Sequence, residues 1–400
     1  MPERRDSHGL YLTALNAEAA TMFFNGPAHV QTSATLFPVG TGVPIEQDLP
    51  VLPQDLARAL FITGRAPHDQ AKHGRSSTYE WCHRVAALPA YLSWSDDPVS
   101  RITRTDLARE LDPSEKGMLS YTLGQAMCQI FAESQLSVRF FMHVARYASA
   151  YNLAFAPGQS RADFFGERTS GGYVVAEAKG RSGPLTNKLR TAMEEQKRTV
   201  KTIKGEAPTI AYASAVHFSS PHSPMRLTAI DPDAVASSAV DLPVDPDLHV
   251  LAYYAPFLDA FAHQEPLILG DYVVAGFAAL GVTLGVLTPV LQRVERAARR
   301  NETAGLHDDI LGLLARHRPR QEHMLYTDGT LSAADWTVPE DRRRPGRRDN
   351  ENLPDFLHEA FRSMNEEEDD WRAEPAEEGD PDWRNLSPAR GYMPGILPQG

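Results

Sequence analysis

The sequence predicts an α/β (α+β) domain in which helices flank a central mixed sheet. Between residues 113 and 230, segments with helical spacing of apolar residues alternate with short runs rich in β-forming residues. Their order is helix, three strands, helix, strand, strand, an alternation typical of a sheet covered by helices. Hydrophobic residues make up 42% and charged residues 23% of the 400-residue chain, which is a globular composition.

The first expected helix has a clear beginning. Asp112 is a suitable N-cap, Pro113 occupies the first helical position, and Glu115 stands three residues after the cap. We therefore expect one long helix, or two, over 113–150, packed on a core. The apolar residues at helical spacing are Leu123, Met127, Ile130, Phe131, Leu136, Phe140, Phe141 and Val144.

Three short strands are expected next. Turn formers separate them at 156–159 and, with two glycines, at 167–172. The last strand begins with apolar residues and ends in Glu177 and Lys179. The three expected strands are residues 151–155, 160–166 and 173–179.

A second amphipathic helix is expected over 185–204. Its apolar face would carry Val200 and Ile203 among others, and Gly205 is a plausible C-terminal stop. Two further strands are then predicted, one at 209–218 and one at 227–230.

The flanking regions divide the chain into three expected parts. Residues 1–110 mix turn formers with short apolar runs and predict a loop-rich N-terminal region of unknown role. Residues 111–336 would form the main domain with a C-terminal extension. Residues 337–400 are expected to be a disordered acidic tail, because 16 acids, 9 bases and many prolines cannot bury a core. The tail is a possible surface for a protein partner.

The tail also explains most of the acidity of the chain. It carries a net charge of −7, so the other 336 residues carry only −5 of the total −12. Total charge therefore does not exclude a nucleic-acid partner. The two cysteines, Cys82 and Cys128, are too few for a disulfide framework. The N-terminus shows no continuous apolar signal segment, so cytoplasmic residence is expected.

An uncharged run at 272–291 leaves two interpretations open. Its length and the arginines that follow it satisfy the crude criterion for a membrane helix. Glycines within the run and Pro289 favour instead a buried pair of strands followed by a helix over 291–300. We expect the second arrangement and keep membrane association as an alternative.

Residues 163–179 hold a combination of side chains suited to phosphodiester hydrolysis. Asp163 and Glu177 lie on neighbouring expected strands joined by a tight connection, so the two carboxylates can converge. Lys179 follows Glu177 by two residues and therefore projects from the same face of its strand. Magnesium prefers one or two carboxylates plus waters, and a nearby cation can stabilise developing negative charge.

These residues resemble the metal-binding core of the PD-(D/E)xK nucleases, the restriction-endonuclease-like superfamily. The resemblance lies in an acid, Asp163, followed by an apolar strand ending in Glu177-Ala178-Lys179, and it extends from the helix near residue 117 to the strand near residue 218. It departs from the family pattern in having Ala162 in place of proline before the acid.

The resemblance implies a restriction-endonuclease-like core and a role for each residue of the motif. Asp163 and Glu177 would hold Mg²⁺, or Mn²⁺ in its place, and Lys179 would position the nucleophilic water. Gln196 or Lys197 would come to the site from the following helix, and Glu133 would support it from the first helix.

A separate observation supports a polyanionic substrate, with DNA as the expected one. Residues 161–204 contain ten bases and five acids, a net charge of +5 in an otherwise acidic chain. The candidate nucleic-acid contacts are Arg161, Arg181, Lys188, Arg190 and Lys197.

Two simpler interpretations remain beside the nuclease hypothesis. The basic helix is equally typical of a solvated outer face. Glu177 with Lys179 also fits a salt bridge at a strand end, which we place behind the catalytic interpretation. A non-catalytic module of the same fold, binding nucleic acid or a protein, would then be the function.

Overall fold

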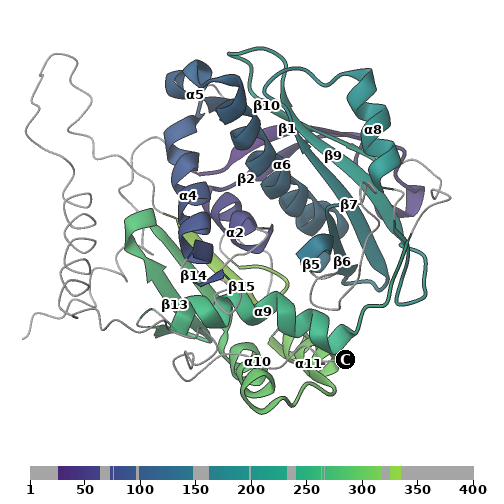
Figure 1. The fold of residues 1–400 in the computed structure, drawn as a ribbon, viewed down its shortest axis with the longest axis vertical. Coiled ribbons are helices and arrows are strands. Elements are labelled where there is room, and N and C mark those ends of the chain that lie inside the picture. The colour runs from purple at the N-terminus through teal and green to yellow at the C-terminus, as the bar shows by residue number, and fades with distance from the viewer. Residues whose placement is uncertain are drawn as a thin grey trace, which may run out of the picture.

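A seven-stranded mixed sheet forms the centre of the protein, in the strand order β2-β1-β10-β9-β7-β6-β5 (Figure 1). Strands β7 and β9 are parallel, as are β1 and β10, and the other neighbours are antiparallel. The strands are β1 (Ala28–Thr35), β2 (Glu46–Val51), β5 (Val138–His143), β6 (Phe164–Arg168), β7 (Tyr173–Gly180), β9 (Ile210–Phe218) and β10 (Met225–Ile230).

The computed structural model describes most of the chain between residues 26 and 334. The described residues are 26–63, 73–74, 76–95, 99–146, 162–197, 200–231, 240–262, 264, 266–317 and 325–334. Some expectations therefore lie outside the described residues, namely those for the strand at 151–155 and for the tail at 337–400.

Helices cover both faces of the sheet, so the expected α/β architecture is confirmed. Helix α6 (Pro113–Leu136) packs on one face, where Tyr212 of β9 donates a hydrogen bond to the Cys128 carbonyl oxygen at 2.9 Å. Helix α8 (Asn187–Lys197) covers the other face, where its Met193 packs on Ala213 and Ala215 of β9. Both cysteines are free thiols, and burial raises the pKa of Cys128 to about 12.

The contact between α6 and β7 is close enough to exclude side chains at two glycines. A Cβ atom on Gly124 would lie 2.6 Å from the backbone of Lys179, and one on Gly180 would lie 1.6 Å from the Ser120 carbonyl oxygen. Gly180 therefore faces α6. Because side chains alternate along a strand, Glu177 and Lys179 face the opposite side, toward α8.

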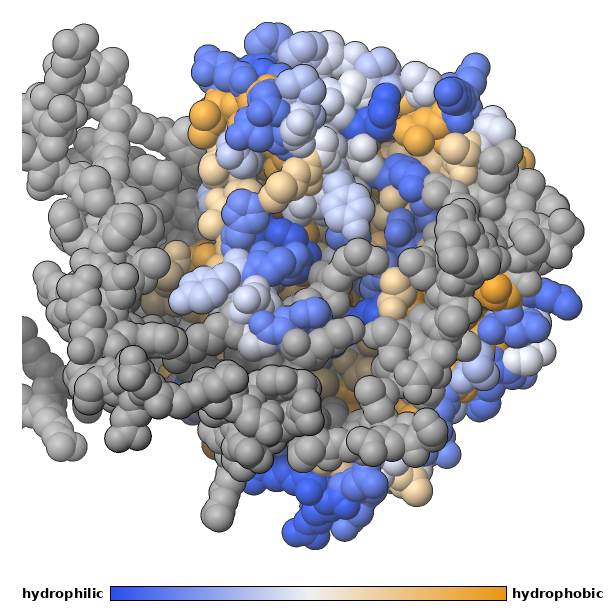
Figure 2. Space-filling view, viewed as in Figure 1, coloured by the Kyte–Doolittle hydropathy of each residue, from blue (hydrophilic) through white to orange (hydrophobic). Residues whose placement is uncertain are grey.

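A smaller antiparallel sheet forms the C-terminal part, in the order β12-β13-β14-β15. Helix α2 (Pro53–Thr63) packs between α6 and β15. Figure 2 shows hydrophilic residues gathered over α10 and α11 at the end of the molecule where these helices lie. The elements are α9 (Pro246–Ala262), β12 (Leu267–Leu269), β13 (Tyr272–Phe277), β14 (Val282–Leu287), α10 (Thr288–Arg300), α11 (Leu306–His317) and β15 (Thr330–Ala334).

The uncharged run at 272–291 forms β13, β14 and the beginning of α10, so the expected strand pair and following helix are confirmed. Within the described residues, no helix combines the length and apolar character needed to cross a bilayer. The remaining elements are η1 (Val39–Thr41), α4 (Ser76–Tyr91), β3 (Leu92–Trp94), β4 (Ile102–Arg104), α5 (Asp106–Glu110), β8 (Val200–Ile203), β11 (Val240–Leu242) and η2 (Ala278–Leu280).

The first predicted helix begins as expected but ends early. The capping box of Asp112 and Glu115 is present, and the helix stops at Leu136 because Ser137 adopts a left-handed conformation with φ of 53°. Phe140 and Phe141 lie in β5, not in a helix. An irregular register in β5 allows both neighbouring phenylalanine rings to be buried. The strand therefore lacks the usual alternation of apolar and polar residues, and its apolar positions continue the helical spacing of α6 in the sequence.

The second predicted helix is also too long. Helix α8 ends at Lys197, and Val200 and Ile203 are buried in β8, which pairs in parallel with β11. A short apolar segment fits either a helix face or a strand, and here the β-branched residues of 200–203 decide for the strand.

The loop-rich expectation for residues 1–110 is wrong for the part that is described. Strands β1 and β2 extend the central sheet, and β1 pairs with β10, so the expected boundary at residue 110 does not separate two sheets. The buried positions of β1 include Ala28, Thr32 and Ala34, small or hydroxylated residues that give a weak apolar pattern.

Candidate active site

The hairpin of β6 and β7 brings the two predicted carboxylates together. Phe164 pairs with Ala176, so one further step places Asp163 opposite Glu177. The Asp163 carboxylate also accepts a hydrogen bond from the Ala178 backbone nitrogen at 3.0 Å, which holds it against β7. The sequence placed this acid within a strand, whereas it stands immediately before β6.

Lys179 completes the constellation on the same strand face. Its Nζ atom lies 2.5 Å from Oε1 of Glu177. The Glu177 side chain is only 1% exposed, whereas that of Lys179 is 29% exposed. The carboxylate therefore forms the floor of the site and the amine its solvent-facing side.

The Glu177 carboxylate is poorly compensated. Burial and, to a smaller extent, the neighbouring Asp163 carboxylate together raise its pKa to about 8, although Lys179 and a hydrogen bond from the Asp163 backbone oppose the rise. The Oε2 atom is buried and has no hydrogen-bond partner among the described residues. A buried acceptor without a partner carries a desolvation penalty. A cation beside this oxygen would remove the penalty and lower the pKa.

The donor set suits a hard divalent cation. Asp163 and Glu177 supply carboxylate oxygens from adjoining strands, and magnesium completes such a set with waters and substrate oxygens. Among the described residues, no group of three or more histidine, cysteine, aspartate or glutamate side chains could hold a metal. Paired carboxylates are the type of ligand that Mg²⁺ or Mn²⁺ takes.

Glu133 does not join the site. It lies on α6, where its carboxylate accepts hydrogen bonds from Arg58 of α2 and from Gln129, each at 2.6 Å. Arg58 also binds Asp328, so Glu133 belongs to a separate buried network between α6 and the smaller sheet. The expected supporting role of this glutamate is therefore wrong.

The other predicted residues divide into two groups. Gln196 and Lys197 lie in the last turn of α8, but their side chains, like Arg161, are outside the described residues. Arg181, Lys188 and Arg190 are exposed, as expected of residues that contact nucleic acid, and that role remains a prediction.

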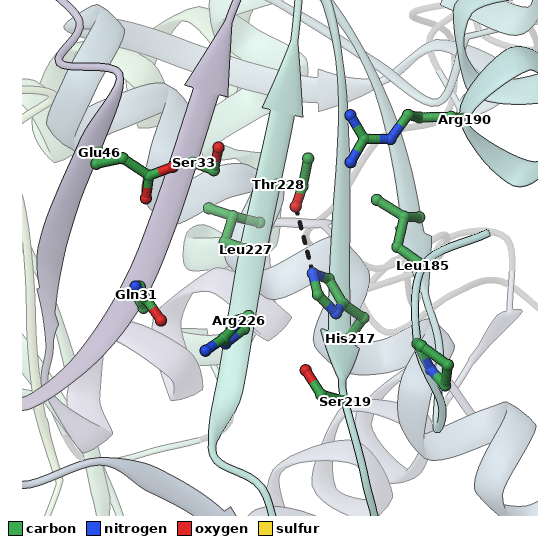
Figure 3. Close-up of a pocket in the computed structure, with 11 residues that line it drawn as sticks. Gln31, Ser33, Glu46, Leu185, Arg190, His217, Ser219, Arg226, Leu227 and Thr228 are labelled. Atoms are coloured by element: carbon green, nitrogen blue, oxygen red, sulfur yellow. Dashed lines mark hydrogen bonds between the residues drawn. The ribbon is translucent and has the colours of Figure 1, made fainter. Parts of the chain in front are cut away.

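A pocket beside the site contains residues that the sequence did not single out (Figure 3). His217 of β9 and Arg226 of β10 line it together with Arg190 of α8. Lys179 pairs with Ala215, and His217 follows two residues later, so both project from one face of the sheet. Counting by two from Ala213 would have identified His217, whereas Arg226 becomes visible only once β10 is known to adjoin β9.

Comparison of the chain with family models, curated protein sequences and solved structures found no match.

Proposed function

We propose that the protein is a metal-dependent nuclease that hydrolyses phosphodiester bonds, with DNA as its substrate. The observation that carries this proposal is the placement of Asp163 opposite Glu177 with Lys179 on the same strand face. The resemblance to the PD-(D/E)xK superfamily supports the proposal. It covers the chain from α6 to β9, and its two carboxylates lie where β6 and β7 pair.

In this mechanism Asp163 and Glu177 would hold the divalent cation. When bound, such an ion polarises the phosphate and lowers the pKa of an attacking water. Glu177 must be deprotonated to act as a ligand, and the Lys179 charge already favours that state. The amine of Lys179 would then orient the water and stabilise negative charge that develops on the phosphate.

The charge around the site supports a polyanionic substrate. Arg181 follows β7 directly, and Lys188 and Arg190 are exposed on α8, which covers the same face of the sheet. Lysine and arginine side chains bind nucleic acid mainly by neutralising phosphates, so these residues would orient the strand before cleavage.

The test compares the wild-type protein with Glu177→Gln and Lys179→Met on plasmid, linear duplex and single-stranded DNA. Incubations with Mg²⁺, Mn²⁺ or EDTA establish the metal dependence. Loss of one transition-state interaction in a buried site typically costs about a hundred- to a thousandfold in rate, so we expect each variant to lose at least that much. The matched controls, Glu206→Gln in the turn after β8 and Lys116→Met in the first turn of α6, remove charges outside the constellation and should cleave normally.

Equal cleavage by all five proteins would mean that a contaminant is responsible, and the nuclease proposal would fail. Cleavage that persists undiminished in EDTA would contradict the metal dependence.

A non-catalytic nucleic-acid-binding module is the second candidate. The close pair of Lys179 and the nearly inaccessible Glu177 favours it, because such a pair can serve as a structural salt bridge. This function predicts DNA binding that weakens with salt, no cleavage with either metal ion, and equal binding by the wild type and Glu177→Gln.

A further inference from the structure

A pocket of about 330 Å³ adjoins the candidate active site on the α8 side of the central sheet. We call it the Arg190–Arg226 pocket. Its lining comes from β1, β2, β9, β10 and α8, from the segment before α8 and from the connection between β9 and β10, so five separate elements and two connections converge on it. The volume is at the lower end of the range for small-molecule sites, which suits a unit the size of one nucleotide and excludes a duplex.

The two arginines of the pocket are available for an anion. Arg190 enters from α8 and Arg226 from β10. Within the described part of the chain, neither guanidinium forms a salt bridge or a hydrogen bond with another residue. Guanidinium groups bind phosphate oxygens with directional, charge-assisted hydrogen bonds.

His217 lies between the two arginines of the pocket (Figure 3), and its electrostatics depend on both of them. Its Nε2 atom is 3.2 Å from the Thr228 hydroxyl, and its buried Nδ1 atom has no hydrogen-bond partner among the described residues. Burial lowers the pKa of the imidazole, and the charges of Arg226 and Arg190 lower it further. The neutral ring therefore adds a hydrogen-bonding group without adding charge.

The side of the pocket across from Arg190 is acidic and polar. Figure 3 shows Glu46 and Arg190 on opposite sides, with Gln31 and Ser33 on the Glu46 side. A phosphate would be repelled by Glu46 and attracted by the arginines, which fixes its orientation. Hydroxyl or amino groups of a nucleoside would fit the acidic side, because a carboxylate accepts hydrogen bonds from both.

We propose that the Arg190–Arg226 pocket binds one nucleotide of the nucleic-acid substrate through its phosphate, next to the position where the strand is cut. The identity of the substrate rests on the proposed nuclease function, whereas the affinity for phosphate rests on the pocket itself. Lys179 pairs with Ala215, and His217 is two residues further on β9, so their Cα atoms are about 8 Å apart. One strand of nucleic acid can therefore contact both.

Binding is measured in EDTA, where cleavage does not interfere, by fluorescence anisotropy with a short single-stranded DNA carrying a 5′-phosphate or a 5′-hydroxyl. Arg190→Gln and Arg226→Gln should each weaken binding about tenfold, the effect of one lost charged hydrogen bond. Each should also reduce the slope of log affinity against log salt by about 0.7. Arg300→Gln, which removes an exposed arginine from the end of α10, is the matched control and should change neither quantity.

A direct readout uses the imidazole signals of His217 in the wild-type protein. Titration with thymidine monophosphate should shift them and raise the pKa of the ring, because an anion then lies beside it. Thymidine without phosphate should leave them unchanged, and inorganic phosphate should reproduce part of the shift. Tighter binding of the DNA with a 5′-phosphate than of the DNA with a 5′-hydroxyl would show that the pocket binds a terminal phosphate. Equal affinity for the two DNAs would show that it binds an internal one.

Unchanged affinity and salt slope in both arginine variants would overturn the proposal, as would equal shifts with thymidine and its monophosphate or absence of DNA binding by the wild type. Its failure is distinguishable from that of the nuclease. Weakened binding in Arg190→Gln without any cleavage by the wild type would retain the pocket and remove the nuclease. Cleavage that requires Glu177 with unaltered binding by the arginine variants would do the reverse.

Discussion

The network around Arg58 and the site at Glu177 both bury carboxylates, yet they compensate them to very different extents. Arg58 is 1% exposed and donates hydrogen bonds of 2.6 Å to Glu133, Asp328 and Thr330. Its guanidinium also lies 3.8 Å above the Tyr326 ring. Among the residues that the structure describes, Glu177 has one cationic neighbour, a second carboxylate beside it, and an oxygen without a hydrogen-bond partner.

The difference is the one expected if the Arg58 network is structural and the Glu177 site binds a ligand, as proposed. Burial raises the pKa of Glu133 to about 7, but in Asp328 the opposing effect of Arg58 and several hydrogen bonds keeps the pKa below its usual range. The Arg58 network joins α2, α6 and β15, and each of its charged groups forms hydrogen bonds within it. Glu177 instead keeps a buried oxygen without a hydrogen-bond partner among the described residues, together with a raised pKa, and perturbed pKa values of this kind are common at functional sites.

Removing Arg58 should produce the largest change in stability. Arg58→Ala leaves Glu133 and Asp328 buried without their cation, and breaking such a pair typically costs about 3–5 kcal/mol of unfolding free energy. Urea denaturation measures the loss. Adding Glu133→Gln to this variant should recover part of it, because one orphaned charge disappears. A cost below about 1 kcal/mol would show that the network does not hold α2 in place.

Glu177→Gln should change stability in the opposite direction. The pKa of Glu177 is about 8 in the folded chain against an ordinary value of 4.5, so folding favours the protonated form. The contribution of Glu177 to the unfolding free energy is therefore full below pH 4.5 and is lost as the pH rises through 8. In EDTA the variant should therefore exceed the wild type by about 1–3 kcal/mol at pH 9 and match it near pH 4. Glu206→Gln should show no such trend, and a pH-independent difference would contradict the incomplete compensation of Glu177.

Magnesium should stabilise the Glu177 site and leave the Arg58 network unaffected. With a dissociation constant of about 1 mM, 10 mM Mg²⁺ would add about 1.4 kcal/mol to the unfolding free energy. The gain should be larger at pH 8 than at pH 6, because the ion competes with the proton on Glu177. Thermal denaturation with Mg²⁺ or EDTA provides the measurement. Asp163→Asn and Glu177→Gln should abolish the gain, and its persistence in both would place the ion elsewhere.

A third, more exposed pair extends the comparison and should have the smallest effect. His307 of α11 lies 2.7 Å from Glu167 of β6, and this hydrogen bond raises the pKa of His307. Burial opposes the shift in Glu167, but the same hydrogen bond and the His307 charge lower its pKa. The histidine contribution is full below pH 6.5 and lost at higher pH, and that of the glutamate is full above pH 4.5 and lost at lower pH.

His307→Gln should therefore cost most between about pH 4.5 and 6.5, and less than about 1 kcal/mol because solvent screens the pair. Urea denaturation at pH 4, 5.5 and 8 would reveal the expected maximum. A cost that increases steadily up to pH 8 would contradict it.

The sequence predicted which side chains lie together at β6 and β7 because their placement depends on local rules. A tight connection places Asp163 beside the strand of Glu177, and a period of two places Lys179 on the face of Glu177. The capping box of Asp112 is equally local. None of these needs information about the order of strands in the sheet.

What the sequence could not predict depends on distant contacts. His217 and Arg226 form one pocket with Arg190 only because β9 and β10 are paired beneath α8. Glu133 was assigned to the wrong cluster because its partner, Arg58, lies 75 residues earlier. Burial on both faces of β5 and the shortness of β8 produced apolar spacing that fits a helix, and only packing distinguished the two.

The pairing of β1 with β10 has a practical consequence for shortening the chain. A protein beginning at Asp112 would retain the whole candidate active site but lose the neighbour that covers the outer backbone of β10. That strand would become an open edge, ready to recruit another polypeptide. We expect such a fragment to aggregate, so the apparent dispensability of the first hundred residues is misleading for anyone who wishes to produce the candidate active site alone.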